Sequence, residues 1–251
     1  MQNMYVGDIG DYGKYGLLRA IFSDYRLGIV WYLVPNETHK TDGKYIDYLS
    51  KPGYRRHDEE LFKKLRTIVD SGKRHVSEIE KSGIFHSNTI YFNQELTYDG
   101  IDANSEEGRS RRILLRERWL EAALKKTKDC RAIFLDPDNG IETPSVKRYS
   151  KASPKYVCFD EIAKFASRKQ IVVVYHHLGR NGTHEFQISQ RALQLKSNLN
   201  CSDRIISLRF KSYSPRAYFI ITNDQMYQPL EFKINKFLQS SWKQCFELAG
   251  Q

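Results

Sequence analysis

Short apolar runs alternate with amphipathic stretches along most of this chain, and this alternation limits the folds open to it. The apolar runs are rich in β-branched and aromatic residues and end at turn-forming or charged residues, as buried strands do. They cover residues 27–34, 89–92, 131–135, 155–159, 170–175, 205–210 and 217–222. Helical periodicity covers residues 15–22, 59–71, 109–126, 185–198 and 232–240. Strands that alternate with helices predict an α/β fold with a doubly wound, mostly parallel sheet.

The length of 251 residues suits one sizeable core. We predict a single α/β domain over residues 1–251, with room for an inserted helical and loop segment around residues 46–110. No run of eighteen apolar residues is present, which argues against a spanning helix and a membrane partner. The N-terminal segment lacks the pattern of a secretory signal, and the four cysteines lack metal-ligand spacing. These features predict a cytoplasmic protein with buried, reduced thiols.

The charge balance points to a polyanionic partner. The chain has 40 Lys and Arg against 30 Asp and Glu, a formal net charge of +10, which favours phosphate-rich molecules. We expect Arg109, Arg112, Arg116 and Arg180 to contact phosphates. Sixteen tyrosines supply rings on which bases could stack, although most rings must lie in the core. The sequence therefore predicts binding to RNA or DNA, and a basic protein without such a partner is the alternative.

The sequence DPDNG (residues 136–140) directly follows the apolar run that ends at Leu135. In a doubly wound sheet, ligands bind beyond the carboxyl ends of the strands, so polar residues at such a position are site candidates. A turn needs the Asp-Pro and Asn-Gly pairs, but it does not need the carboxylates of Asp138 and Glu142. Carboxylates at a strand end suit a divalent metal ion or a substrate amine. We predict catalytic roles for Asp136, Asp138 and Asn139.

His176 and His177 end the most apolar of the predicted strands, and Arg180 follows soon after. Histidine titrates near neutral pH, which suits it to proton transfer or metal binding. We count both histidines as catalytic candidates. Because neighbouring strand residues point to opposite faces, we expect only one of them to face the site. At a third strand end, Asp160 is predicted to cap a helix over residues 161–166.

Two further segments are predicted to bind the polar groups of a ligand. The glycine-rich residues 7–16 precede a helix, so their backbone amides could hold a phosphate or carboxylate, with Lys14 adding charge. They have neither Walker A nor GxGxxG spacing, and a flexible arm is the alternative. Residues 36–45 follow the first strand, where a nucleotide-binding doubly wound fold has its cofactor loop.

Taken in order, these segments resemble the bacterial family that methylates N6 of an adenine in 23S ribosomal RNA with S-adenosylmethionine. The matching stretches are Gly7-Asp8 with Asp11 and Lys14-Tyr15, Glu37-Thr38-His39, Gly43-Lys44-Tyr45, Asp136-Pro137-Asp138-Asn139, residues 217–223 and residues 237–242. The first stretch is similar to the family's Gly-Asn-x-x-Asp-x-x-Lys-His opening, and the next two are similar to its Asp-Thr-His and Gly-Arg-Tyr loop. Residues 136–139 are similar to its Asp-Pro-Pro-Tyr motif, and the last two stretches are similar to its terminal strand and Pro-Trp segment.

The resemblance implies a Rossmann-like fold of methyltransferase type with S-adenosylmethionine as cofactor. The implied cofactor-binding residues are Asp8, Lys14, Glu37, Thr38, His39 and Gly43. It also implies that Asp136 accepts hydrogen bonds from the target amine of a flipped base. Asn139 stands where the family has an aromatic residue, so base stacking must come from elsewhere. Lys40, Thr41 and Asp42 stand where the family has glycines.

Two other function classes stay open. A metal-dependent hydrolase of nucleic acid or nucleotides would hold Mg²⁺ or Mn²⁺ with Asp136, Asp138 and Glu142, and would use His176 or His177 as a base or further ligand. A non-catalytic adaptor would retain the fold and bind nucleic acid or a protein. The resemblance and the basic charge favour a methyltransferase-like enzyme, whereas the additional carboxylate and the histidine pair favour the hydrolase.

Overall fold

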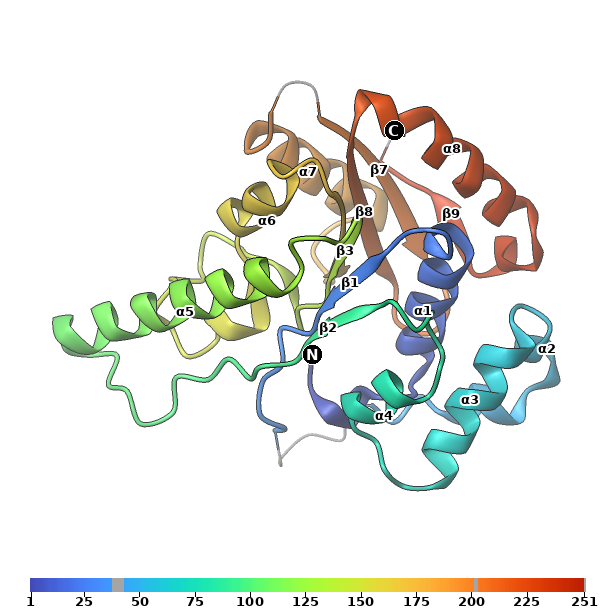
Figure 1. The fold of residues 1–251 in the computed structure, drawn as a ribbon, viewed down its shortest axis with the longest axis horizontal. Helices are drawn as coiled ribbons and strands as arrows, with labels where there is room; N and C mark the ends of the chain where they lie inside the picture. The colour runs from blue at the N-terminus through green and yellow to red at the C-terminus, as the bar shows by residue number, and fades with distance from the viewer. Residues whose placement is uncertain (38–42, 201–202, 251) are drawn as a thin grey trace.

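The computed structural model describes residues 1–37, 43–200 and 203–250. A central sheet is covered by helices on both faces (Figure 1). Its strands, in spatial order, are β2 (Ile90–Phe92), β1 (Leu27–Val30), β3 (Ala132–Leu135), β6 (Ile171–His177), β8 (Arg216–Asn223), β7 (Asp203–Phe210) and β9 (Phe246–Leu248). This arrangement confirms the predicted α/β, doubly wound, Rossmann-like fold.

The parallel strands place their carboxyl ends at one edge of the sheet. Strands β2, β1, β3 and β6 are parallel, and β8 is antiparallel to both β6 and β7. The chain runs from β1 outward to β2 and then returns to β3 on the other side of β1, so the strand order reverses between β1 and β3. In such sheets, the crevice beyond the carboxyl ends at this reversal is the usual ligand site.

The sheet separates two hydrophobic cores. Ala132 and Phe134 face one core, and Ile133 and Leu135 face the other, as alternation along a strand requires. The first core is covered by α1 (Ile9–Phe22), α3 (Glu59–Asp70), α4 (Val76–Lys81) and α8 (Asp224–Gln239). The second is covered by α5 (Glu106–Lys126), α6 (Phe159–Ala166) and α7 (His184–Ser197). Burial on both faces explains why the parallel strands are continuously apolar.

Several short elements complete the described chain. They are η1 (Asn3–Tyr5), η2 (Asp47–Ser50), α2 (Pro52–Arg55), η3 (Ser153–Lys155) and η4 (Ser241–Gln244), with a separate parallel pair, β4 (Gly140–Ile141) and β5 (Tyr156–Val157). The predicted strand over residues 155–159 is therefore two residues long and lies outside the central sheet. The segment around residues 46–110 contributes β2 to the sheet and the apolar faces of α3 and α4 to the first core.

Helix α1 begins earlier than its periodicity predicted, because the glycine-rich segment is itself helical. Asp8 caps the helix by accepting a hydrogen bond from the backbone nitrogen of Asp11 at 3.0 Å. Gly13 and Gly16 lie against the rings of Phe210 and Trp242, and a Cβ at either would come within 2.5 Å or 2.2 Å of ring atoms. The glycines therefore permit close packing. Because residues 9–16 are helical and buried, the alternative prediction of a flexible N-terminal arm is wrong.

Helix α6 also differs from its prediction. It begins at Phe159, with Cys158 at the N-cap position, and the Glu161 carboxylate accepts a hydrogen bond from the Cys158 backbone nitrogen at 3.0 Å. Asp160, the predicted cap, lies in the first turn and pairs with Arg148 instead.

Two global expectations concern membranes and thiols. No helix of the described chain combines the length and apolarity needed to cross a membrane. Cys130, Cys158 and Cys245 are buried and unpaired, as predicted, and Cys201 lies outside the described residues.

Candidate functional site

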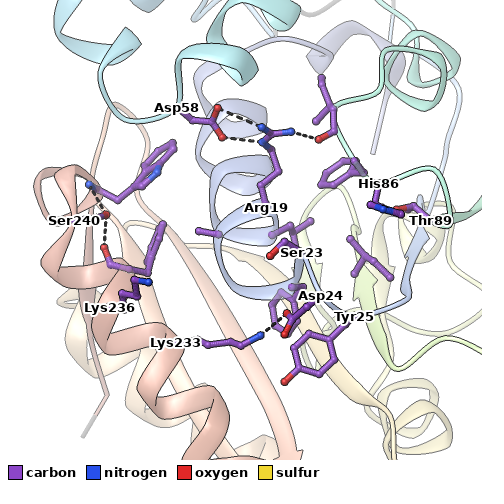
Figure 2. A pocket seen from close by; sticks show the side chains of 18 of the residues that line it. Arg19, Ser23, Asp24, Tyr25, Asp58, His86, Thr89, Lys233, Lys236 and Ser240 are labelled. Atoms are coloured by element: carbon purple, nitrogen blue, oxygen red, sulfur yellow. Dashed lines mark hydrogen bonds and ion pairs between the residues drawn. The ribbon is translucent and has the colours of Figure 1, made fainter.

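A hollow of about 1070 Å³ lies along α1, beside α8 and the segment that precedes β2 (Figure 2). Most of its charged groups are already paired. Arg19 donates to Asp58 at 2.7 Å, and Lys233 forms an ion pair with Asp24. None of the predicted site residues lines this hollow, so its size alone does not make it the candidate site.

A second cavity, of about 450 Å³, lies at the carboxyl edge of the sheet, and we call it the edge cavity. Its volume falls in the range of roughly 300–1,000 Å³ typical of small-molecule sites. Its lining residues are Met1, Tyr5, Asp8, Gly10, Asp11, Lys14, Gly43, Lys44, Tyr45, Asp136–Asn139, Tyr175, His177, Arg180, Ser214 and Arg216. Segments that the sequence indicated separately therefore meet around one cavity.

A buried ion-pair network forms its floor. The Lys14 Nζ donates to Asp136 Oδ2 at 2.7 Å and to Asp11 Oδ1 at 2.9 Å, and all three side chains are at most 5% exposed. Burial raises the pKa of Asp136, and the Lys14 ammonium offsets only part of this effect. Burial alone would lower the pKa of Lys14, but the two carboxylates outweigh it and raise that pKa. Lys14 is therefore a fixed cation between two acids.

Next to this network, Asp8 faces the guanidinium of Arg216 at 3.8 Å. Burial raises the pKa of the Asp8 carboxyl despite this neighbour. Gly10 lets Arg216 lie against the first turn of α1, because a Cβ there would come within 2.7 Å of the guanidinium. On the strand register, Tyr218 lies opposite Tyr175, and its buried hydroxyl has no hydrogen-bond partner in the described chain.

The segment after β3 forms one rim of the edge cavity. Asp138 accepts a hydrogen bond from Gln2 Nε2 at 2.8 Å and lies 3.6 Å from Lys155 Nζ, which pairs with Glu37 at 2.7 Å. Glu37, a predicted cofactor ligand, is thereby connected to this rim. The side-chain amide of the half-buried Asn139 makes no hydrogen bond within the described residues. Thr38 and His39, also predicted ligands, lie outside those residues.

Cations and a constrained glycine also line the edge cavity. Lys44 and Arg180 are exposed, and neither has a carboxylate partner within residues 1–37, 43–200 and 203–250. Gly43 adopts φ +71°, and a Cβ would come within 2.1 Å of the Met4 carbonyl oxygen. Arg74 donates to the Gly43 carbonyl at 2.7 Å and holds this turn in place. The predicted ligand Gly43 thus has a backbone role at the rim, with free cations beside it.

The two histidines have different environments. His177 lines the edge cavity and is exposed there. The buried part of its ring lowers its pKa most, and the positive charge of Arg216 lowers it further. His176 points away, packs on the backbone of Gly140, and accepts a hydrogen bond from the Ile141 backbone nitrogen at 3.1 Å. Burial lowers the pKa of His176 to about 3, so its ring is neutral and structural. The expectation that one histidine faces the site agrees with this geometry, and His176 is not that residue.

Two of the predicted phosphate-binding arginines are structural. Arg116 is 1% exposed and pairs with Glu161 at 2.6 Å and 2.9 Å. Arg112 is 7% exposed and donates to the carbonyls of Ile101 and Tyr149. Arg109 is exposed, although it donates to the Ala103 carbonyl at 2.8 Å. Arg112 and Arg116 share one face of α5 with the buried Trp119 and Ala123, and burial of this face removes both arginines from a phosphate-binding surface.

Of the three carboxylates proposed for a metal site, Asp136 and Asp138 line the edge cavity and Glu142 does not. Glu142 Oε1 accepts a hydrogen bond from the Phe159 backbone nitrogen at 2.8 Å, away from the cavity lining. Among the described residues, the one group of three possible metal ligands is Glu142, Cys158 and Asp160. Asp160 is paired with Arg148, and burial raises the pKa of the Cys158 thiol, which disfavours the thiolate that binds metals.

The sequence analysis gave Arg216 and Tyr175 no role at the site, and it named Asp11 only as part of the resemblance. Asp11 carried a usable signal, because it lies three residues before Lys14 on the same helix. Arg216 was missed because only strand ends were considered. Since β8 is antiparallel to β6, its first residue lies at the cavity edge.

Comparison of this chain with protein-family models, with curated proteins and with solved structures found no match.

Proposed function

We propose that the edge cavity receives a nucleotide of a nucleic acid, and that the protein is a methyltransferase-like enzyme acting on it. The target would be an adenine N6 amine, and the methyl donor S-adenosylmethionine. One observation carries the proposal. Lys14, Asp136 and Asn139, which come from segments indicated independently by sequence, lie around one nucleotide-sized cavity with unpaired cations at its rim.

The charge distribution suits a nucleotide unit. Lys44 and Arg180 are exposed at the mouth and lack carboxylate partners in the described chain, so they are available to phosphate oxygens. The interior carries hydrogen-bonding groups that suit a base edge. Arg180 keeps its predicted role in this proposal, whereas Arg112 and Arg116 do not.

The roles within the cavity follow from which groups are already engaged. Asp136 is held by Lys14, so we assign this pair to positioning residues 136–139 rather than to contacting the amine. The Asn139 amide is unpaired in the described chain, and its oxygen can accept a hydrogen bond from the amine. Methylation of an amine releases a proton. His177, whose pKa is lowered, is neutral at neutral pH and can accept that proton.

We assign the binding of S-adenosylmethionine to residues that line the cavity. Asp138 would face its amino group, and Lys44 or Arg180 would face its carboxylate. When bound, the cofactor supplies an activated methyl group, while the protein's residues hold it and orient the acceptor.

A non-catalytic adaptor is the second candidate, and a specific observation favours it. The crevice directly after β1 is filled, because Trp31 and Tyr32 are fully buried and the Met1 backbone nitrogen donates to the Tyr32 carbonyl at 2.8 Å. A cofactor would have to lie beside β3 and β6 instead. No comparable observation favours the hydrolase, since Glu142 and His176 are engaged elsewhere.

The test combines calorimetry with methyl transfer. Metal-free protein is titrated with S-adenosylmethionine, S-adenosylhomocysteine and Mn²⁺, and incorporation of labelled methyl groups into RNA and DNA is then measured. We expect micromolar binding of both methionine cofactors. Asn139→Ala should abolish incorporation at unchanged Tm, whereas Asn235→Ala, which removes an exposed amide on α8, should not.

Each other outcome redirects the assignment. Nucleic-acid binding without any cofactor binding would replace the enzyme with the adaptor. Mn²⁺ binding accompanied by Mn²⁺-dependent cleavage would replace it with the hydrolase.

A further inference from the structure

Two tyrosine rings are exposed at the mouth of the edge cavity. Tyr45 lines the cavity and is 41% exposed, while Tyr213, next to the lining residue Ser214, is 37% exposed. Their ring centroids are 5.6 Å apart, with 60° between the ring planes. Most of an aromatic ring's hydrophobic stabilisation is lost when it faces water. An exposed pair beside a cavity is therefore a surface available to a ligand.

Tyr213 is held in an unfavourable backbone conformation. It adopts φ +60°, and Lys169 is the other described non-glycine residue with positive φ. Bulky residues rarely occupy this region, and such strain often accompanies a functional constraint. The Tyr213 hydroxyl donates to Asp47 at 2.7 Å and accepts from Lys51 at 2.7 Å. These contacts fix the ring against Tyr45.

Tyr45 is anchored through its backbone. Its carbonyl accepts a hydrogen bond from the Ile9 backbone nitrogen, at the start of α1, at 2.9 Å. The Lys44 ammonium lies 5.9 Å from the centroid of the Tyr45 ring. An exposed ring and an exposed cation are thus adjacent at the mouth of the edge cavity.

We infer that Tyr45 stacks on an unpaired nucleobase at the cavity mouth, with Tyr213 as the residue that positions its ring. Aromatic rings next to cations are the combination by which proteins bind single-stranded nucleic acid. Asn139 has no ring that could stack on a base, whereas Tyr45 presents an exposed ring at the cavity mouth. The inference rests on the nucleic-acid partner of the proposed function, but it needs neither the cofactor nor methyl transfer.

The experiment measures affinity for two labelled strands by fluorescence anisotropy. One strand carries a single central adenine between abasic residues, and the other is fully abasic. The wild type should bind the adenine strand roughly 5- to 150-fold more tightly, as expected for stacking of one base. Tyr45→Ala should bind both strands equally, and Tyr45→Phe should keep the preference. Phe232→Ala, which removes a 71% exposed ring outside the edge cavity, is the matched control.

Salt dependence separates stacking from charge. Tyr45→Ala should leave the slope of log Kd against log salt unchanged, whereas Lys44→Ala should lower it by about one. Tyr213→Phe keeps its ring but loses the hydroxyl bonds to Asp47 and Lys51. It should weaken the preference for adenine without changing affinity for the abasic strand.

The outcomes distinguish this inference from the proposed function. If Tyr45→Ala retains the wild-type preference for adenine, the stacking role is overturned while nucleic-acid binding stands. If the wild type binds neither strand, both the stacking role and the nucleic-acid partner are overturned.

Discussion

Two buried ion-pair networks in this protein are built alike but differ in what surrounds them. In one, Arg116 of α5 pairs with Glu161 of α6 at 2.6 Å. In the other, Lys14 of α1 pairs with Asp136, directly after β3, at 2.7 Å. Both cations are almost completely buried, and both have pKa values raised by carboxylates that outweigh the effect of burial. A perturbed pKa therefore does not separate a structural pair from a site.

The Arg116 network is sealed. Arg116 also donates to the carbonyls of Ser153 and Tyr156, at 2.8 Å and 2.6 Å. Glu161 accepts from the Tyr32 hydroxyl at 3.1 Å, in addition to its bond with the Cys158 nitrogen. All of this bonding capacity is used to hold α5, α6 and the turn before β5 together.

The Lys14 network instead borders a cavity. Asn139 beside it has an unpaired amide, and Lys44 and Arg180 lack carboxylate partners within the described ranges. The comparison teaches that buried charge alone does not identify a functional site. Polar groups that face an accessible cavity and have no hydrogen-bond partner are a better criterion for choosing a candidate site.

The largest effect should come from opening the sealed network. Arg116→Ala leaves Glu161 buried without its cation, and we expect a loss of about 3–5 kcal/mol in the free energy of unfolding. Urea denaturation measures it, and Arg118→Ala, exposed on the same helix, should change stability by no more than about 0.5 kcal/mol. A loss below about 1 kcal/mol for Arg116→Ala would break the comparison.

The adjacent histidines extend the comparison to pH. Burial lowers the folded-state pKa of His176 to about 3, so stability is lost as pH falls from the ordinary value of 6.5 toward 3. The slope for one proton is about 1.4 kcal/mol per pH unit. His176→Gln should remove this slope from denaturation curves measured across the interval. His177→Gln should change it less, because His177 is exposed, and equal effects would contradict the sealed position of His176.

The cavity network should respond asymmetrically to its two partners. Lys14→Met leaves Asp11 and Asp136 without a shared cation, and we expect a loss of about 1–3 kcal/mol, moderated by water in the cavity. Asp136→Asn, the matched variant, keeps an acceptor for Lys14 and should cost less.

The pH profile sharpens this test. Because burial raises the folded-state pKa of Asp136, its contribution is greatest at low pH and is lost as pH rises through that pKa. The difference in unfolding free energy between Asp136→Asn and the wild type should therefore shift in favour of the variant as pH rises toward neutral. If Lys14→Met and Asp136→Asn lose the same unfolding free energy, the Lys14 network is a structural ion pair like that of Arg116.

The smallest effect on stability is expected at the cavity rim. Arg180→Ala and Lys44→Ala remove exposed cations and should leave the urea midpoint unchanged. Each should weaken nucleic-acid binding and lower its salt slope by about one, as measured by anisotropy at several salt concentrations. An unchanged slope in both variants would remove the rim from the nucleic-acid surface.

The sequence by itself determined the doubly wound fold and the segments that meet at the cavity. The alternating strands and helices, the polar residues after Leu135, and the glycine-rich segment that contains Lys14 are local patterns that folding preserves. Tertiary structure decided which of their side chains are available. Arg116 is sealed and Arg180 is free because burial depends on what packs against a residue, and the antiparallel direction of β8 brings Arg216 to the cavity. Such contacts join residues far apart in the chain, and no local pattern encodes them.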